Sequence, residues 1–212
     1  MGGSRLCEDS INSIKAYQRR GKESAQEDAR MTGPKTTIEF VDEEVCADEH
    51  DDALVLELNI GGCDVARVLV DNGSSVDVIT YDCLTRMEIE DLVIGGRPRK
   101  VSGFNGDVAL SLGTVNLPVY AGTVHRMTEF MVLDVRSHFN VILGRPWIHS
   151  MKAVPSTYHR CIKFPGRIEG TIDEIRGSSE AYRICYMMHY RAMSASKDVE
   201  KAEGSGSKPA AQ

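Results

Sequence analysis

One carboxylate in this sequence stands where it could do chemistry. Asp71 follows the apolar run 68–70 and precedes Asn72, Gly73, Ser74 and Ser75. When two carboxyl groups share a buried site, repulsion and desolvation let them hold one proton between them. Such a pair takes a proton from water and gives one to a carbonyl oxygen, which is the chemistry of amide hydrolysis. Gly73 permits a tight turn that leaves two carboxylates room to face each other.

Taken alone, this segment has an ordinary interpretation, because Asp-Asn-Gly is also a common turn after a strand. A second segment changes the balance. An aliphatic run ends in a glycine and an arginine at Ile142, Leu143, Gly144 and Arg145. Pro146 comes next, and proline is favoured at the first position of a helix, so we expect a short helix that ends near Met151.

The elements that must position these segments are mostly strands. Apolar residues recur at every second position over 54–60, which is the period of a strand, and a turn at Gly61 and Gly62 leads into a second strand over 65–70. A helical turn is expected at 81–87. Further strands are expected at 76–80, 115–119, 130–135 and 141–143, with hairpins over 101–112 and over 158–172 around Pro165 and Gly166. We therefore predict an all-β fold, a closed or sandwich-like barrel with one short helix, over residues 36–175.

Composition excludes several classes of protein. The 212 residues are 42% hydrophobic and 26% charged, as in a globular domain, and a net charge of −6 disfavours contact with nucleic acid. We find no apolar run of membrane-spanning length and no secretory segment near Met1, so we expect neither membrane contact nor secretion. The six cysteines form no C-x-x-C pair and are expected to be reduced thiols in the cytoplasm or nucleus.

The ends of the chain are expected to lie outside the folded domain. Residues 1–35 lack a sustained apolar period, which predicts a disordered linker, and residues 176–212 predict a short helix and a flexible tail. The histidines after residue 100 are scattered without ligand spacing, and consecutive residues around His50 do not readily converge on one ion. We therefore expect no metal site and no cofactor.

The two segments, in this order, resemble the retropepsins, the retroviral-type aspartic proteases. Members of that family carry Asp-Thr/Ser-Gly after an apolar strand, and later aliphatic residues followed by Gly-Arg and a short helix. The resemblance extends to the protease region of plant gypsy-type LTR retrotransposon Gag-Pol polyproteins and covers about residues 36–175. The stretches that carry it are 50–55, 70–75, 103–106, 142–147 and 152–159.

The resemblance implies a subunit with one catalytic carboxylate, Asp71, which becomes active when an identical subunit supplies the second across a two-fold axis. It also implies a peptide or polyprotein substrate, and a flap that closes over it at Gly103, Phe104, Asn105 and Gly106. In the family, the arginine of the second motif is structural and holds the active-site turn through a carboxylate. Ser75 stands where many members place that carboxylate, so Asp77 is expected to pair with Arg145 instead.

Two positions depart from the family pattern. Pro146 replaces the Asn or Asp of retroviral members and matches the plant elements instead. Asn72 stands where the family has the Thr or Ser that braces the two catalytic loops across the dimer, and its planar amide offers both a donor and an acceptor. Two functions therefore stay open. One is an aspartic endopeptidase that cleaves a retrotransposon polyprotein, and the other is an inactive retropepsin-fold remnant that dimerises or binds peptides.

Overall fold

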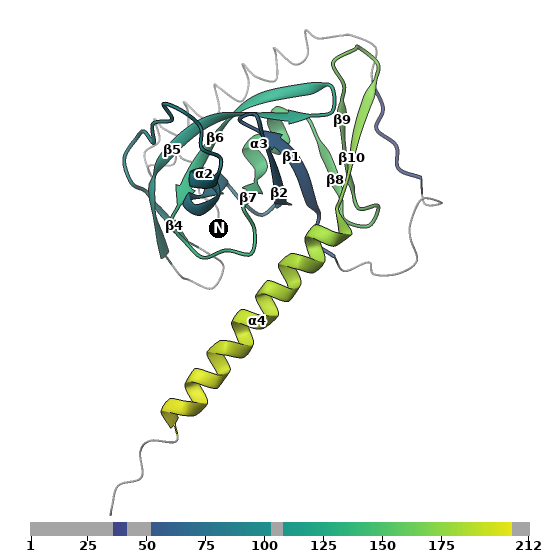
Figure 1. The fold of residues 1–212 in the computed structure, drawn as a ribbon. Coiled ribbons are helices and arrows are strands. Elements are labelled where there is room, and N and C mark those ends of the chain that lie inside the picture. The colour runs from purple at the N-terminus through teal and green to yellow at the C-terminus, as the bar shows by residue number, and fades with distance from the viewer. Residues whose placement is uncertain (1–35, 42–51, 103–107, 205–212) are drawn as a thin grey trace, which may run out of the picture.

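The computed structural model describes residues 36–41, 52–102 and 108–204, and its centre is a barrel of strands (Figure 1). Strands β1 (Val55–Ile60) and β2 (Cys63–Val70) form the first hairpin, turning at Gly61 and Gly62 as the sequence predicts. The other barrel strands are β3 (Asp77–Thr80), β4 (Lys100–Ser102), β5 (Val108–Ala121), β6 (Val124–Leu133) and β7 (Val141–Leu143).

Six of these strands close on themselves within the described part of the chain. The order β1-β2-β7-β3-β6-β5 is completed by a second pairing, of β1 with β5, and β4 continues the sheet beyond β5. The pairs β2–β7 and β3–β6 are parallel, whereas the remaining barrel pairs are antiparallel. The all-β closed barrel expected from the sequence is therefore confirmed.

The β5–β6 hairpin is longer than the separate strands predicted for this region. The two strands pair continuously from Ala121 and Val124 to Ser111 and Leu133, with a shift of register between Ser111 and Gly113. Gly113 has a φ of +143°, and a Cβ at this position would overlap the carbonyl group of Gly95. The glycine therefore marks a bulge that bends the strand without ending it.

The core of the barrel is filled by side chains that point inward from alternate strand positions. Leu56, Ile60, Val68 and Phe130 are each 0% exposed. Burial of one such side chain stabilises a fold by about 1.5–3 kcal/mol. Two six-residue helices, α2 (Tyr81–Arg86) and α3 (Arg145–Ser150), add Leu84 and Trp147 to the same cluster. Helix α2 lies where the sequence predicted a helical turn at 81–87, and α3 is the short helix expected from Pro146.

A second, three-stranded sheet follows the barrel and differs from the hairpin predicted over 158–172. Its strands are β8 (Val154–Ser156), β9 (Cys161–Pro165) and β10 (Ile172–Arg176), in the order β10-β9-β8. The turn after β9 spans 166–171 because Gly166 N donates to Thr171 O and Thr171 N donates to Ile168 O. Because of these bonds, the returning strand β10 begins only at Ile172.

The last element is helix α4 (Ser179–Gly204), which projects away from the barrel (Figure 1). It begins where the sequence suggested a short helix but runs for 26 residues. The predicted linker at 1–35 and the end of the predicted tail, 205–212, lie outside the described residues. No helix in the described part of the chain has the length and apolar character needed to cross a membrane.

Candidate active site

The candidate catalytic residue, Asp71, is held at the end of a central barrel strand. Strand β2 lies between β1 and β7, and Val70 is in parallel register with Leu143. Asp71 N donates to Leu143 O at 2.9 Å, so the backbone of Asp71 is fixed by the second sequence motif. Asp71 is half-buried. Val68 and Val70, earlier on the same strand, are buried.

The turn after Asp71 orients the carboxylate through backbone groups. Gly73 N donates to Asp71 Oδ1 at 2.8 Å, and Ser74 N donates to the backbone carbonyl of Asp71 at 3.2 Å. A side chain is poorly accommodated at Gly73, because a Cβ would lie 3.1 Å from Asp71 Oδ1. One carboxylate oxygen is thus engaged by the turn itself, and Asn72 and Gly73 are exposed.

The two serines of the turn have different surroundings. Ser74 Oγ donates to Val76 O at 2.6 Å, so this hydroxyl group is bonded within the turn. Ser74 O accepts the backbone N–H of Arg145 at 3.0 Å. Ser75 is exposed. Ser74 therefore links the turn after Asp71 to the start of α3.

Gly144 and Arg145, far along the chain, complete the support of this turn. Arg145 Nη1 donates to the carbonyl oxygens of Asn72 and Gly73, at 3.1 and 2.9 Å. Gly144 packs so closely that an added Cβ would lie 2.5 Å from Val76 O and 2.9 Å from Ser74 O. The structure thus brings together the two motifs that the sequence singled out.

Asp77 does not have the partner that the sequence predicted. No ion pair joins it to Arg145 in the described chain; instead, Asp77 Oδ1 accepts the backbone N–H of Gly144 at 2.7 Å, and the backbone N–H of Trp147 also favours the charged carboxylate. The N-cap of α3 is Gly144, which has no side chain to cap the helix, so Asp77 satisfies these N–H groups from β3. The predicted Asp77–Arg145 pair is wrong because the Arg145 side chain donates to the carbonyl oxygens of Asn72 and Gly73 instead.

The carboxyl group of Asp77 is almost fully enclosed. The residue is 3% exposed, and burial raises the pKa of Asp77 to about 6, while the hydrogen bonds from Gly144 and Trp147 oppose the rise. Because its carboxylate is committed to α3, Asp77 is a structural residue next to the candidate site rather than a second catalytic group.

An apolar surface next to the turn was missed by sequence analysis. Val78, Met131 and Leu133 form a buried cluster separate from the main core, and partly buried side chains pack against it, among them Val76, Val101, Ala109 and Ile142. They come from β3, β4, β5, β6, β7 and the residue after the turn, so only the closure of the barrel assembles them. The strand periodicity predicted the elements but not which strands become neighbours.

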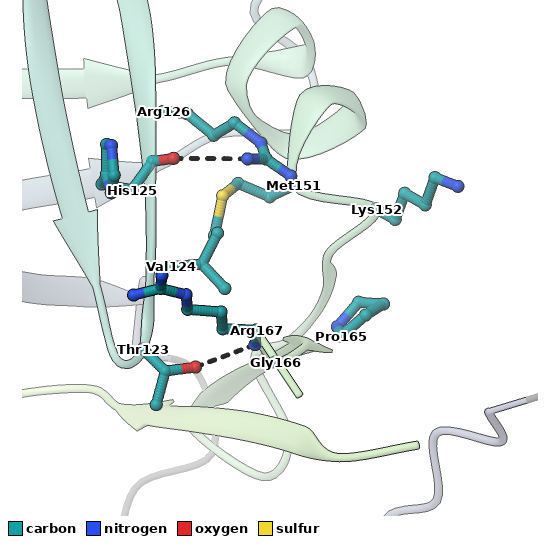
Figure 2. Close-up of a pocket in the computed structure, with 9 residues that line it drawn as sticks. All are labelled: Thr123, Val124, His125, Arg126, Met151, Lys152, Pro165, Gly166 and Arg167. Carbon is teal, nitrogen blue, oxygen red and sulfur yellow. Dashed lines mark hydrogen bonds between the residues drawn. The ribbon is translucent and has the colours of Figure 1, made fainter. Parts of the chain in front are cut away.

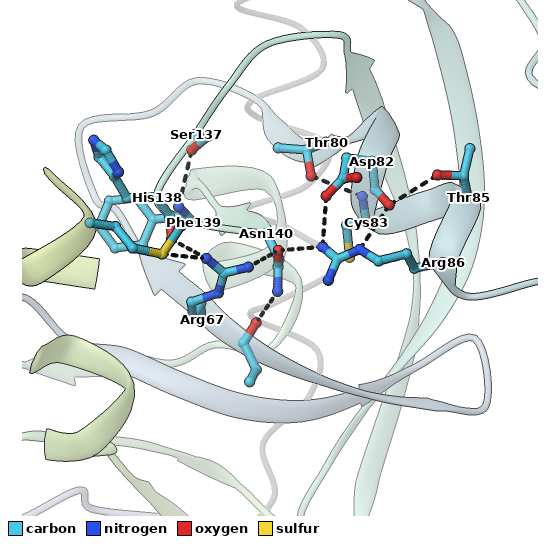
Figure 3. Close-up of polar contacts among 12 residues, drawn as sticks. Arg67, Thr80, Asp82, Cys83, Thr85, Arg86, Ser137, His138, Phe139 and Asn140 are labelled. Atoms are coloured by element: carbon cyan, nitrogen blue, oxygen red, sulfur yellow. Dashed lines mark hydrogen bonds and ion pairs between the residues drawn. The ribbon is translucent and has the colours of Figure 1, made fainter. Parts of the chain in front are cut away.

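The polar support on the other side of β2 was also missed. Asn140 Oδ1 accepts from Arg67 Nη2 at 2.8 Å and from Arg86 Nη2 at 3.2 Å, while Asn140 Nδ2 donates to Ala66 O at 2.8 Å (Figure 3). This side chain therefore ties β2 and α2 to the start of β7. A single asparagine before a short strand gives no sequence signal for such a role.

The predicted flap residues, Gly103, Phe104, Asn105 and Gly106, lie outside the described residues. The strands on either side of them are described: Ser102 of β4 pairs with Val108 of β5 in an antiparallel ladder. The hairpin that would carry a flap is therefore present, and the role of its tip stays a prediction.

A pocket of about 500 Å³ lies elsewhere, between the β5–β6 turn, the end of α3 and the segment after β9 (Figure 2). No carboxylate lines it. Its Arg126 donates to Ser150 O at 3.3 Å, so this arginine satisfies a carbonyl group at the end of α3. The residues that line this pocket therefore include no carboxylate of the kind that the sequence singled out at Asp71. Among the described residues, no group of His, Cys, Asp and Glu is arranged to hold a metal ion.

No protein-family model and no curated protein matches this sequence. Solved structures similar to the chain include EIAV protease complexed with the inhibitor HBY-793, at 19% identity and a TM-score of 0.41, covering 50% of this chain and 94% of the protease. The retroviral protease-like domain of Ddi1 from Leishmania major has 14% identity and a TM-score of 0.45, covering 61% and 96%. A retropepsin-like aspartic protease from Rickettsia conorii has 15% identity and a TM-score of 0.36, covering 59% and 91%. These structural neighbours are retropepsin-like aspartic proteases.

Proposed function

We propose that this chain is one subunit of a homodimeric aspartic endopeptidase, with Asp71 of two copies as the catalytic pair. The observation that carries the proposal is the buttressed turn. Asp71 is half-buried at the end of β2, Gly73 N–H orients its carboxylate, and Arg145 holds the turn from behind. A turn serving only to reverse the chain has no need of this support from a second, distant motif.

The mechanism follows from two carboxyl groups that share one proton. The ionised carboxylate takes a proton from water, whose oxygen attacks the carbonyl carbon of the scissile peptide. The protonated partner gives its proton to the carbonyl oxygen. The tetrahedral intermediate then collapses, the C–N bond breaks, and the leaving nitrogen receives a proton. The hydrogen bond from Gly73 N–H to Asp71 Oδ1 leaves Oδ2 as the oxygen available to the water.

The substrate in this proposal is an extended peptide. It would add as a strand between the β4–β5 hairpin and the catalytic turn, held by main-chain hydrogen bonds. The partly buried Val76 and Ile142, which pack on the Val78 cluster beside the turn, favour an aliphatic substrate side chain there. We further propose that the protease domain spans 36–175 and that its substrate is a polyprotein of the gypsy-type retrotransposon kind. The cysteine pattern favours action in the cytoplasm or nucleus.

Asn72 favours a second candidate function, an inactive fold that dimerises or binds peptides. Asn72 is exposed, and its backbone carbonyl accepts from Arg145, so the turn is built normally around it. An amide in place of a hydroxyl changes only the contact that would be made across the dimer. The two candidates therefore differ in activity and not in fold.

The test is cleavage of a Gag-like polypeptide at mildly acidic pH by the wild type, Asp71→Asn and Asp134→Asn. Asn at position 71 keeps an oxygen to accept the Gly73 N–H, so the turn should survive while acid–base chemistry is lost. Asp134 is exposed and serves as the isosteric control. We expect Asp71→Asn to lower kcat/KM by about a thousandfold or more and Asp134→Asn to leave it within about twofold. A folded, dimeric wild type that cleaves nothing would reject the enzyme in favour of the inactive candidate.

A further inference from the structure

The pocket at the end of α3 has walls from three segments that are far apart in the sequence (Figure 2). They are the β5–β6 turn, the residues at the end of α3 and the residues that follow β9. Arg167 N donates to Thr123 Oγ1 at 3.0 Å, which joins the segment after β9 to the turn. Arg126 Nε donates to Ser150 O, which joins β6 to the end of α3. The walls of this pocket are therefore fixed to one another by hydrogen bonds.

Part of the lining is apolar. Val124, Met151 and Pro165 line the pocket, and Val124 packs against the main core, to which Met151 belongs. Met151 is buried, whereas Val124 and Pro165 are half-buried. A volume of about 500 Å³ lies within the range of sites that bind small organic molecules, which are mostly apolar with a few polar groups that orient the ligand.

The charged residues that line the pocket are basic. They are Arg126, Lys152 and Arg167, and none of the three forms an ion pair with an acidic side chain in the described part of the chain. The whole sequence has 31 acidic and 25 basic residues. A wall with three basic residues and no acidic one is therefore opposite in sign to the chain as a whole.

One carboxylate lies close behind this wall. A Cβ at Gly166 would lie 2.8 Å from Asp173 Oδ1. Asp173 Oδ2 accepts from Thr123 N and from Thr123 Oγ1, at 2.7 and 2.6 Å, so this oxygen is bonded to the β5–β6 turn. Three basic side chains against one acidic side chain still leave the pocket with a positive charge.

The two arginines keep hydrogen-bond donors for a ligand. Their side chains lie on opposite sides of Val124 in Figure 2. Arg126 donates through Nε and Nη1, to Ser150 O and His125 O, which leaves its second Nη group. The Arg167 side chain has no hydrogen-bond partner among the residues that the structure describes. A guanidinium group with free donors suits an anionic head group, which it can hold with two parallel hydrogen bonds.

We infer that this pocket binds a small organic anion, a molecule with an apolar body and one anionic head group. The apolar body would contact Val124, Met151 and Pro165, and the head group would lie between the basic side chains. An inorganic anion would leave the apolar surface uncovered, and a neutral molecule would leave the basic side chains without a partner. The inference does not rest on the proposed function, because the pocket lies at the end of α3 and the turn at 71–75 is bonded to its start.

The experiment titrates the full chain with anilinonaphthalene sulfonate, a fluorescent organic anion, and follows its emission. The test variant is Arg167→Glu. We expect it to raise the Kd of the probe about fivefold or more, because an attraction is replaced by a repulsion. The matched control is Arg97→Glu, an exposed arginine outside the pocket, which should change the Kd by less than about twofold. Arg167→Lys, which keeps the charge, should bind nearly as well as wild type, and thermal melting verifies that each variant is folded.

Two further probes separate the parts of the ligand. Phenylnaphthylamine lacks the charge, so it should not distinguish wild type from Arg167→Glu. Naphthoate, which carries a carboxylate on an apolar body, should displace the sulfonate probe from wild type, whereas inorganic phosphate at the same concentration should not.

Three results would overturn the inference. The first is an equal Kd for Arg167→Glu and Arg97→Glu. The second is displacement of the probe by phosphate as readily as by naphthoate, which would indicate a site for simple anions. The third is displacement by tetraglutamate but not by naphthoate, which would indicate a site for an acidic peptide instead.

Discussion

The turn at 71–75 and strand β3 each contain an aspartate that accepts a backbone N–H group, and the two aspartates are six positions apart. Asp71 accepts the N–H of Gly73 from its own turn and is half-buried. Asp77 accepts the N–H of Gly144 from a distant segment and is 3% exposed. Asp71 is bonded within its own turn and stays partly exposed, whereas a long-range hydrogen bond holds the buried Asp77 against a distant segment.

The comparison shows that burial and the source of the hydrogen-bond donors decide which role each aspartate can have. Asp77 holds α3 in place by satisfying N–H groups that Gly144 leaves without a side-chain cap. The Asp71 side chain accepts a hydrogen bond from its own turn, and the residue is half-buried. The Asp77 carboxylate is bonded to the backbone at the start of α3 and therefore has a structural role, whereas the chemical role that we propose falls to Asp71.

The largest effect expected from this comparison is a pH dependence of stability. Because the pKa of Asp77 is raised in the folded state, its contribution to stability is fully present below the ordinary value of 3.8 and is lost as pH rises through about 6. A shift of this size corresponds to about 3 kcal/mol. We expect the stability of the wild type relative to Asp77→Asn to fall by roughly that amount between pH 3.5 and pH 7.

Urea denaturation of the two proteins across that pH range measures the difference. The matched control is Asp134→Asn, whose stability relative to wild type should stay flat because Asp134 is exposed. If the free energies of unfolding of wild type and Asp77→Asn differ by the same amount at every pH, the pKa of Asp77 is not raised by burial and the comparison with Asp71 fails.

A smaller effect is expected at the point where the two regions touch. Gly144→Ala forces a Cβ to within 2.5 Å of Val76 O, so the turn and α3 must move apart. We expect a loss of about 1–3 kcal/mol in stability, with reduced cleavage because Ser74 moves too. Gly95→Ala is the control, since a Cβ there meets only Thr114 O at 4.0 Å, and chemical denaturation compares the two. Equal stabilities would mean that the two regions are not rigidly packed.

The sequence predicted the strands and motifs well because periodicity and glycine turns are local properties. It failed where a residue's partner is set by closure of the barrel. Arg145 was expected to find Asp77, yet carbonyl groups of Asn72 and Gly73 lie closer, and Asn140 gave no local sign of its contacts with Arg67 and Arg86. The length of α4 was underestimated because its last third is rich in charged residues, which resemble a solvated tail in the sequence.

The most direct test of the central claim, that two Asp71 residues form one active site, is a subunit-mixing experiment. Wild type and Asp71→Asn are mixed in equal amounts, equilibrated above the dimer Kd, and assayed for cleavage. Random pairing leaves about one quarter of the dimers with two aspartates, so activity per wild-type subunit should fall to about half of its unmixed value. An activity per wild-type subunit that is unchanged by mixing would contradict the account, because it would mean that one Asp71 acts alone.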